Sequence, residues 1–256
     1  MTTTCDPFAG AMLRFAETHG LLPRGARVLT ALSGGRDSMA LLTRYAPFNY
    51  VSLNKDETSA QTLSRVAKYM EGLGLSPDVL DAFPFQLSGG MRQRAVIALA
   101  TFMSPNVVLA DEPTTALDVV VQRGILMMLM RLQKQFKNTL VIVSHDMGVH
   151  YQITDRMGIM YSGSFVELGP TQAIFDDPIH PYTKMLIGAL PRVGDKSQKV
   201  GIPGRPPALK NPPPGCRFAA RCPQATDKCR QDPAPEFREI KPGRFAACHY
   251  LESEVN

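Results

Sequence analysis

The sequence lacks the features that mark membrane-spanning, secreted and nucleic-acid-binding proteins. None of its apolar runs is long enough to cross a bilayer as a helix. Residues 1–10 contain neither a basic segment nor an apolar stretch, so we expect no secretory leader and a cytoplasmic protein. The formal net charge of +5 is too small over this length to indicate nucleic acid by itself. The length of 256 residues predicts one large domain with an appendage.

Cysteine is scarce outside one segment near the C-terminus. Four of the five cysteines lie there, with the spacing C-x5-C-x6-C-x18-C: Cys216, Cys222, Cys229 and Cys248. In a reducing compartment such a group favours metal binding over disulfides. The short C-x2-C pairs that are usual for structural zinc are absent. This favours an iron–sulfur cluster over zinc, and both over four free thiols.

The density of proline rises in the same part of the chain. Residues 193–256 hold 10 of the 21 prolines, so few regular elements are expected there. We expect a linker over about residues 193–201, followed by a small irregular appendage that is stapled by metal.

Residues 44–192 alternate helices and strands in the way that is typical of an α/β fold. The expected helices are 62–73, 90–101 and 119–136, and the expected buried strands are 106–110 and 139–143. Short apolar strands joined by helices favour a mainly parallel sheet with helices on its faces. Residues 1–43 add an expected strand at 27–32, followed by a glycine-rich loop and the start of a helix.

One short motif is suited to phosphate binding. Residues 87–94 read LSGGMRQR and stand just before an expected helix. The backbone N–H groups of Gly89 and Gly90 and the hydroxyl of Ser88 can surround a phosphate at the positive end of that helix. Taken alone, Ser-Gly-Gly is a common turn sequence.

Two expected strands end in side chains that suit metal and proton chemistry. After the first strand, the carboxylate of Asp111 is placed to hold a hydrated Mg²⁺, and that of Glu112 to take a proton from water. After the second strand, His145 can contact a phosphate or position water. Each motif alone has a simpler interpretation. Asp111 and Glu112 can be a solvated acidic pair at the start of a turn, and His145 can be a hydrogen-bonded histidine at the rim of the core.

In this order and spacing, the motifs resemble the nucleotide-binding domain of ABC transporters. The resemblance covers residues 44–192 and identifies 87–94 as the signature, 107–112 as the Walker B strand and 116–118 as the D-loop. It implies a P-loop-NTPase-like fold that binds ATP and Mg²⁺ and forms ADP and phosphate. In it, Asp111 serves Mg²⁺, Glu112 is the general base and His145 is the switch histidine.

The resemblance also implies a site shared between two subunits. Ser88, Gly89 and Gly90 then bind the γ-phosphate of ATP held by a second ABC ATPase subunit, and Asp118 links the two sites across the dimer. Met91, residues 161–167 and the run HPYT at 180–183 are similar to ATP-binding subunits of oligopeptide, dipeptide and nickel importers.

That subfamily resemblance implies further partners and a cofactor. It implies the transmembrane subunits of an importer as partners and no nucleic acid. It implies a peripheral position at the cytoplasmic face of the inner membrane. Some members carry a [4Fe–4S] cluster in the C-terminal region, which here is residues 193–256.

The phosphate-binding loop that such an ATPase uses is missing from the sequence. No G-x-x-x-x-G-K-[ST] run is present, and Tyr45 stands where the Q-loop glutamine is expected, so the domain is incomplete at its N-terminus. Residues 11–43 instead resemble the PP-loop segment of tRNA-lysidine-synthetase-type ATP pyrophosphatases. In that resemblance the pyrophosphate of ATP is bound by Ser33, Gly34, Gly35, Asp37 and Ser38. A chimera joined near residue 43 is favoured over a diverged phosphate-binding loop.

Three functions are therefore open from the sequence. The first is the energy-coupling subunit of a peptide or nickel importer, competent in a site shared with a partner ATPase. The second is an ATP pyrophosphatase that adenylates its substrate and forms AMP and pyrophosphate. The third is a non-catalytic interaction subunit.

Overall fold

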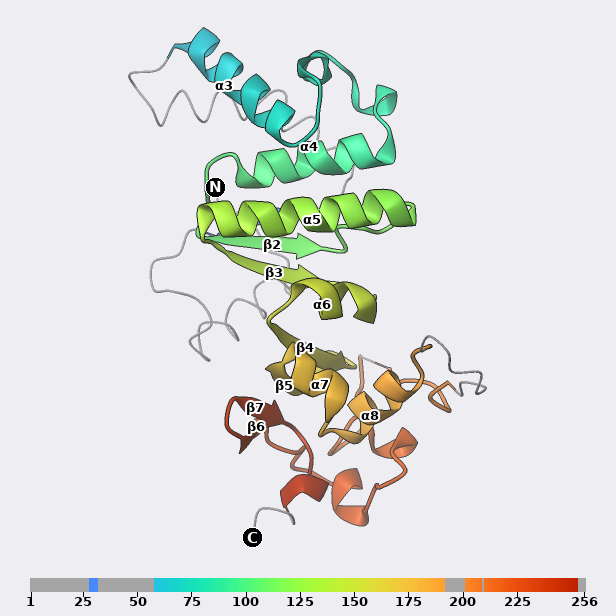
Figure 1. The fold of residues 1–256 in the computed structure, drawn as a ribbon. Coiled ribbons are helices and arrows are strands. Elements are labelled where there is room, and N and C mark those ends of the chain that lie inside the picture. The colour runs from blue at the N-terminus through green and yellow to red at the C-terminus, as the bar shows by residue number, and fades with distance from the viewer. Residues whose placement is uncertain (1–27, 32–57, 192–200, 209, 253–256) are drawn as a thin grey trace. The chain divides into compact units, whose positions relative to one another are not determined.

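The computed structural model describes residues 28–31, 58–191, 201–208 and 210–252 (Figure 1). The chain divides into two compact units, Met1–Asp146 and Met147–Asn256, each with its own structure. No helix among the described residues is long and apolar enough to span a membrane.

A parallel three-stranded sheet forms the base of the first unit. Its strands are β1 (Val28–Ala31), β2 (Val107–Asp111) and β3 (Thr139–Val143), in the order β1-β2-β3. Both pairings are parallel, so the carboxyl ends of all three strands meet at one edge of the sheet. The parallel sheet expected from the sequence is confirmed over these residues.

Three long helices accompany this sheet: α3 (Ser59–Gly72), α4 (Gly89–Thr101) and α5 (Val119–Phe136). Short 3-10 turns at Pro77–Leu80 and Pro84–Gln86 lie between α3 and α4. Each long helix begins at a capping side chain that accepts a hydrogen bond from the third helical N–H: Thr58, Ser88 and Asp118. Such caps stabilise a helix by about 1 kcal/mol and fix where it starts.

The core of the first unit is built between these helices. In α5 the buried residues recur at helical spacing, as in Ile125, Met128, Leu129 and Leu132. They pack with apolar side chains of α3 and α4 in one cluster. Burial of each such side chain stabilises the fold by roughly 1.5–3 kcal/mol, so packing holds these helices in place.

The second unit is built on an antiparallel sheet. Strands β4 (Arg156–Tyr161), β5 (Ser164–Pro170), β6 (Arg238–Lys241) and β7 (Arg244–Ala246) lie in the order β4-β5-β7-β6. The turn between β4 and β5 has φ of 46° at Ser162 and 79° at Gly163, two positive values in succession, as in a tight hairpin turn. Helices α6 (Met147–Ile153), α7 (Thr171–Asp176) and α8 (Pro181–Gly188) complete this unit with 3-10 turns at Ala219–Arg221, Asp227–Arg230 and Tyr250–Glu252.

The C-terminal region is ordered by packing against residues 156–191. Phe218 is 1% exposed, and its ring makes edge contacts with those of Tyr161 and Tyr182 at 5.1 and 5.3 Å. Strand β7 pairs with β5, far away in the sequence. The described part of the region is therefore tied into the sheet and core of the second unit.

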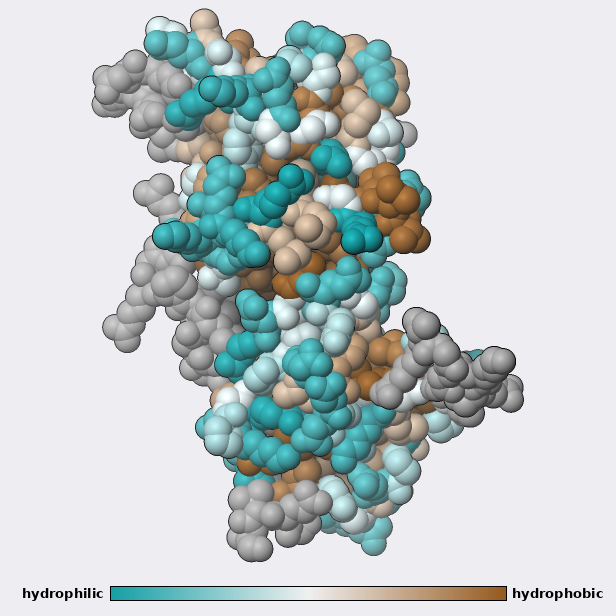
Figure 2. All heavy atoms as spheres, in the orientation of Figure 1, coloured by the Kyte–Doolittle hydropathy of each residue, from teal (hydrophilic) through white to brown (hydrophobic). Residues whose placement is uncertain are grey.

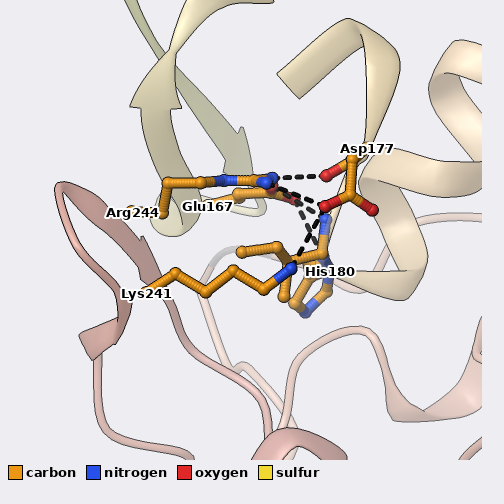
Figure 3. A network of polar contacts seen from close by, with 6 residues as sticks. Glu167, Asp177, His180, Lys241 and Arg244 are labelled. Atoms are coloured by element: carbon orange, nitrogen blue, oxygen red, sulfur yellow. Dashed lines mark hydrogen bonds and ion pairs between the residues drawn. The ribbon is translucent and has the colours of Figure 1, made fainter. Parts of the chain in front are cut away.

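A buried polar network reinforces this join (Figure 3). The carboxylate of Glu167 on β5 accepts hydrogen bonds from the backbone N–H groups of Ile179 and His180 at 2.9 and 2.8 Å. It also forms an ion pair with Arg244 on β7 at 3.1 Å, while Arg244 and Lys241 both reach the carboxylate of Asp177. The two strands and the segment between α7 and α8 are thus joined through one buried carboxylate.

Candidate functional site

The site begins at the carboxyl edge of the three-stranded sheet, where the polar ends of β2 and β3 meet. The N–H of Glu112 donates to the carbonyl of Val143 at 2.8 Å, which extends the strand pairing by one residue. Nδ1 of His145 lies 2.7 Å from Oε1 of Glu112, and the His145 N–H donates to the same oxygen at 3.1 Å. The hydroxyl of Thr115 donates to Oε2 at 2.9 Å. Two residues that are 33 positions apart therefore form one hydrogen-bonded pair.

The charges of this pair favour the ionised forms of both residues. Burial alone raises the pKa of Glu112, but the hydrogen bonds from His145 and Thr115 and the charge of His145 outweigh it, and the pKa is lowered. The hydrogen bond to Glu112 raises the pKa of His145, as do the negative charges of Glu112 and Asp146. The carboxylate can thus accept a proton, and the exposed imidazole can donate a hydrogen bond to an anion.

Asp111 lies beside this pair in the sequence, at the exposed end of β2. No group of three or more His, Cys, Asp or Glu side chains that could hold a metal ion occurs among the described residues. Protein sites for Mg²⁺ commonly use one or two carboxylates, with water and substrate phosphates as the other ligands. The single carboxylate of Asp111 fits that kind of site.

The signature residues form a second group, at the start of α4. The Ser88 hydroxyl accepts a hydrogen bond from the N–H of Met91 at 3.3 Å, and Gly89 begins the helix. A Cβ added to Gly90 would stand 2.7 Å from a methyl group of Val121 on α5, closer than real side chains approach. The second glycine is therefore required by the close approach of α4 to the first turn of α5.

That first turn of α5 follows the D-loop and carries an exposed apolar pair. Asp118 caps the helix by accepting a hydrogen bond from the N–H of Val121 at 2.9 Å. Val119 and Val120 are 81% and 82% exposed. Figure 2 shows an apolar patch at the surface in the part of the molecule that α5 occupies. The start of α4, which carries the signature, thus lies against the first turn of α5, which follows the D-loop.

The predicted phosphate-binding loop at residues 33–38 lies outside the described residues, as does Tyr45. Strand β1, which precedes that loop, pairs with β2 on the side opposite β3.

Sequence reasoning missed Thr115 and Gln122. Thr115 binds Glu112, and Gln122 binds Asp146, the residue after His145. Threonine in a turn and glutamine on a helix are too common to single out, and only the spacing of Gln122 one turn after Asp118 hinted at its position.

The four C-terminal cysteines lie near one another in the second unit. Burial raises the pKa of Cys216 and of Cys222, and raises that of Cys248 to about 11. The thiols also interact electrostatically: Cys216 with Cys222 and Cys229, and Cys248 with Cys216 and Cys222. All four are free thiols, and none forms a disulfide. The metal staple expected from the sequence is not supported, because what orders this region is the packing and the ion pairs described above.

Comparison with known proteins identifies two families along the chain. Residues 36–115 match the family described as ABC transporter. Residues 166–229 match the family described as oligopeptide/dipeptide transporter, C-terminal region.

Individual relatives agree with these matches. The putative oligopeptide transport ATP-binding protein YkfD of Bacillus subtilis is 40% identical over 207 residues, which are 79% of this chain and 63% of that protein. The dipeptide transport ATP-binding protein DppD of Caldanaerobacter subterraneus is 40% identical over 195 residues, 75% of this chain and 60% of that protein. The chain therefore spans about three fifths of the length of these relatives.

A solved structure gives a weaker likeness. The dimeric, post-hydrolysis ATP-binding cassette MJ0796 with bound ADP and phosphate has a TM-score of 0.48 and 23% identity, and covers 57% of this chain and 63% of its own. The family matches and the relatives agree with each other: the chain is similar to ABC transporters over residues 36–115 and to the C-terminal region of oligopeptide/dipeptide transporters over residues 166–229.

Proposed function

We propose that the chain is the ATP-binding, energy-coupling subunit of an ABC importer of peptides, at the cytoplasmic face of the inner membrane. The contact of Glu112 with His145 carries this proposal, because it joins a base and a hydrogen-bond donor at one edge of the sheet. The relatives are named as peptide-transport proteins, which favours peptides over nickel as the cargo class.

In this proposal each residue at the sheet edge has one task. Asp111 would hold Mg²⁺, which neutralises phosphate charge when bound. Glu112, ionised at neutral pH, accepts the proton of the attacking water. His145 fixes the carboxylate through Oε1 and donates to the γ-phosphate that the water attacks.

The proposed site is shared with a second ATPase subunit. The sequence contains no G-x-x-x-x-G-K-[ST] run, so the partner supplies the phosphate-binding loop. Ser88, Gly89 and Gly90 then close the partner's site on the γ-phosphate. The exposed valines that follow Asp118 support a partner surface there, because contiguous apolar patches mark contact sites and Figure 2 shows such a patch in the part of the molecule that α5 occupies. The importer's transmembrane subunits complete the assembly.

Product analysis tests this function. The chain is incubated with Mg-ATP, alone and with a peptide-importer ATPase chosen for an intact phosphate-binding loop, and the nucleotides are separated by chromatography. We expect ADP from the mixture, lost when Ser88→Arg blocks the signature. Release of AMP and pyrophosphate would instead assign the activity to residues 33–38, the pyrophosphatase alternative. Equal ADP formation with Ser88→Arg contradicts the shared site, and no nucleotide cleavage favours a non-catalytic subunit.

We also propose that the four C-terminal thiols bind a [4Fe–4S] cluster, with zinc as the alternative. Their number and the resemblance to importer ATPases that carry such a cluster support the proposal. In this proposal the cluster would add to the packing and ion pairs that already order the region, and would not transfer electrons, because ATP hydrolysis needs no redox step. Anaerobically purified protein is expected to be brown and to hold about four iron atoms per chain. Colourless protein that contains zinc would favour the alternative.

A further inference from the structure

A hydrogen bond joins the helix after the D-loop to the turn that carries His145. Nε2 of Gln122 donates to Oδ2 of Asp146 at 3.3 Å, across 24 positions of sequence. Both side chains are partly buried, so this contact is shielded from water more than a surface contact would be.

Each partner of this bond is fixed by its own neighbours. Gln122 lies in the first turn of α5, where its backbone N–H donates to the carbonyl of Asp118 at 2.8 Å. At the other end, the N–H of Asp146 donates to the hydroxyl of Ser144 at 3.1 Å, which shapes the turn after β3. The side-chain bond therefore connects two ordered segments. Without it, the turn after β3 loses this contact with α5.

His145 stands in that turn and depends on its shape. The imidazole is 81% exposed, so packing does not hold it. Its contacts with Glu112 come from one ring nitrogen and from its own backbone N–H. A small rotation of the turn would break both contacts with the carboxylate.

We infer that Gln122 is a positioning residue, which holds the His145 turn against the helix that follows the D-loop through Asp146. The inference rests on the proposed function, in which Glu112 and His145 act on ATP. The bond from Gln122 to Asp146 connects the start of α5 directly to the sheet edge. Asp118 of the D-loop belongs to the same helical turn as Gln122.

Gln122→Met tests this role with two measurements. Methionine keeps the length of the side chain and its helix propensity but removes the donor. The first measurement follows the His145 ring by NMR at one pH in the full chain with ¹³C-labelled histidine, the signal being assigned by its loss in His145→Gln. The second determines kcat and KM for ATP in the mixture with the partner ATPase.

A matched control lies on the same helix. Gln133 donates to the backbone carbonyl of Asn138 at 3.1 Å, near the other end of α5. Gln133→Met removes a comparable bond far along the helix from the His145 turn. We expect Gln122→Met to shift or broaden the His145 signal and to lower kcat about tenfold with KM unchanged, whereas Gln133→Met changes neither.

The outcomes separate this inference from the proposed function. An unaltered His145 signal in folded Gln122→Met overturns the inference, and so does an altered signal with an unchanged kcat in an active mixture. If the signal changes but the wild-type mixture forms no ADP, the positioning role stands and the proposed function fails. If Gln122→Met does not fold, Gln122→Glu replaces it, because it keeps the side-chain length and also removes the donor; the same outcomes then decide.

Discussion

Backbone strain at Glu112 marks the candidate site. Glu112 has a φ of 45°, in the left-handed region that side chains other than glycine rarely adopt. Its N–H is bonded to β3, and its carboxylate to His145 and Thr115, so the surroundings hold it there. Residues that the surrounding contacts hold in a strained backbone conformation are typical of functional sites. The conformation turns the carboxylate toward His145 rather than along the strand.

Replacing this carboxylate is the first residue-level prediction. Glu112→Gln keeps the shape of the side chain but cannot accept a proton as a base. We expect ATP hydrolysis in the mixture with the partner ATPase to fall by about 100-fold or more, while ATP still binds. Glu71→Gln, an exposed position on α3, is the control. A rate close to wild type for Glu112→Gln would remove Glu112 from the chemistry.

Gly90→Ala tests the close approach of α4 and α5. The new Cβ would meet a methyl of Val121 at 2.7 Å, so we expect a loss of about 1–3 kcal/mol in the free energy of unfolding measured with urea. Gly72→Ala is the control, because a Cβ there meets nothing within 4 Å. Adding Val121→Ala should restore part of the loss. Equal stability of the two single variants would contradict this packing.

At the scale of elements, local sequence patterns predicted the bounds of individual helices and strands. They did not predict the pairing of strands that are distant in the sequence. The bounds of α5 and β3 match the expectation, because Asp118 caps the helix and the apolar spacing is regular over its whole length. Glu112 and His145 were each predicted from the end of an expected strand and from the ABC resemblance. The parallel pairing of β2 with β3 brings them together. The pairing of β7 with β5 was not predicted, because it joins residues about 80 positions apart and leaves no local pattern.

The ion pair between β5 and β7 gives the element-level prediction. Arg244→Leu leaves the buried carboxylate of Glu167 without its cation, and we expect a loss of roughly 3–5 kcal/mol in the free energy of unfolding. Lys241→Met is the control, because its contact with Asp177 is at the surface and contributes under about 1 kcal/mol. Similar losses in urea unfolding for both variants would refute the special role of the buried pair.

At the scale of the whole molecule, the proposed catalytic residues and the C-terminal cysteines lie in different units. The first unit holds Glu112, His145 and the signature, and the second holds the four C-terminal thiols. Each unit has its own apolar core. Unfolding of the second unit can therefore be followed with spectroscopic signals from side chains that lie in that unit alone.

Acid is such a condition, through His180. This histidine is 1% exposed, and burial lowers its pKa to about 4, partly offset by a hydrogen bond to the backbone of Ala247. Above the ordinary pKa of about 6.5 the imidazole is neutral in both the folded and the unfolded states. Between that value and about 4 only the unfolded state binds the proton, so stability falls as the pH falls. The loss should approach about 3 kcal/mol below pH 4.

His180→Asn isolates this contribution. Nδ1 of His180 accepts a hydrogen bond from the N–H of Tyr182 at 3.0 Å at the start of α8, and an asparagine oxygen can accept the same bond. Urea unfolding at pH 7, 5.5 and 4.5 can be followed by tyrosine fluorescence with Tyr45, Tyr50 and Tyr69 replaced by phenylalanine in both proteins. The remaining tyrosines, Tyr161 and Tyr182 among them, then lie in the second unit. We expect the variant to lose less stability than the wild type between pH 7 and 4.5. If His180 causes the loss of stability in acid, its removal must make the free energy of unfolding depend less on pH. The same pH dependence in both proteins would therefore mean that another group binds the proton.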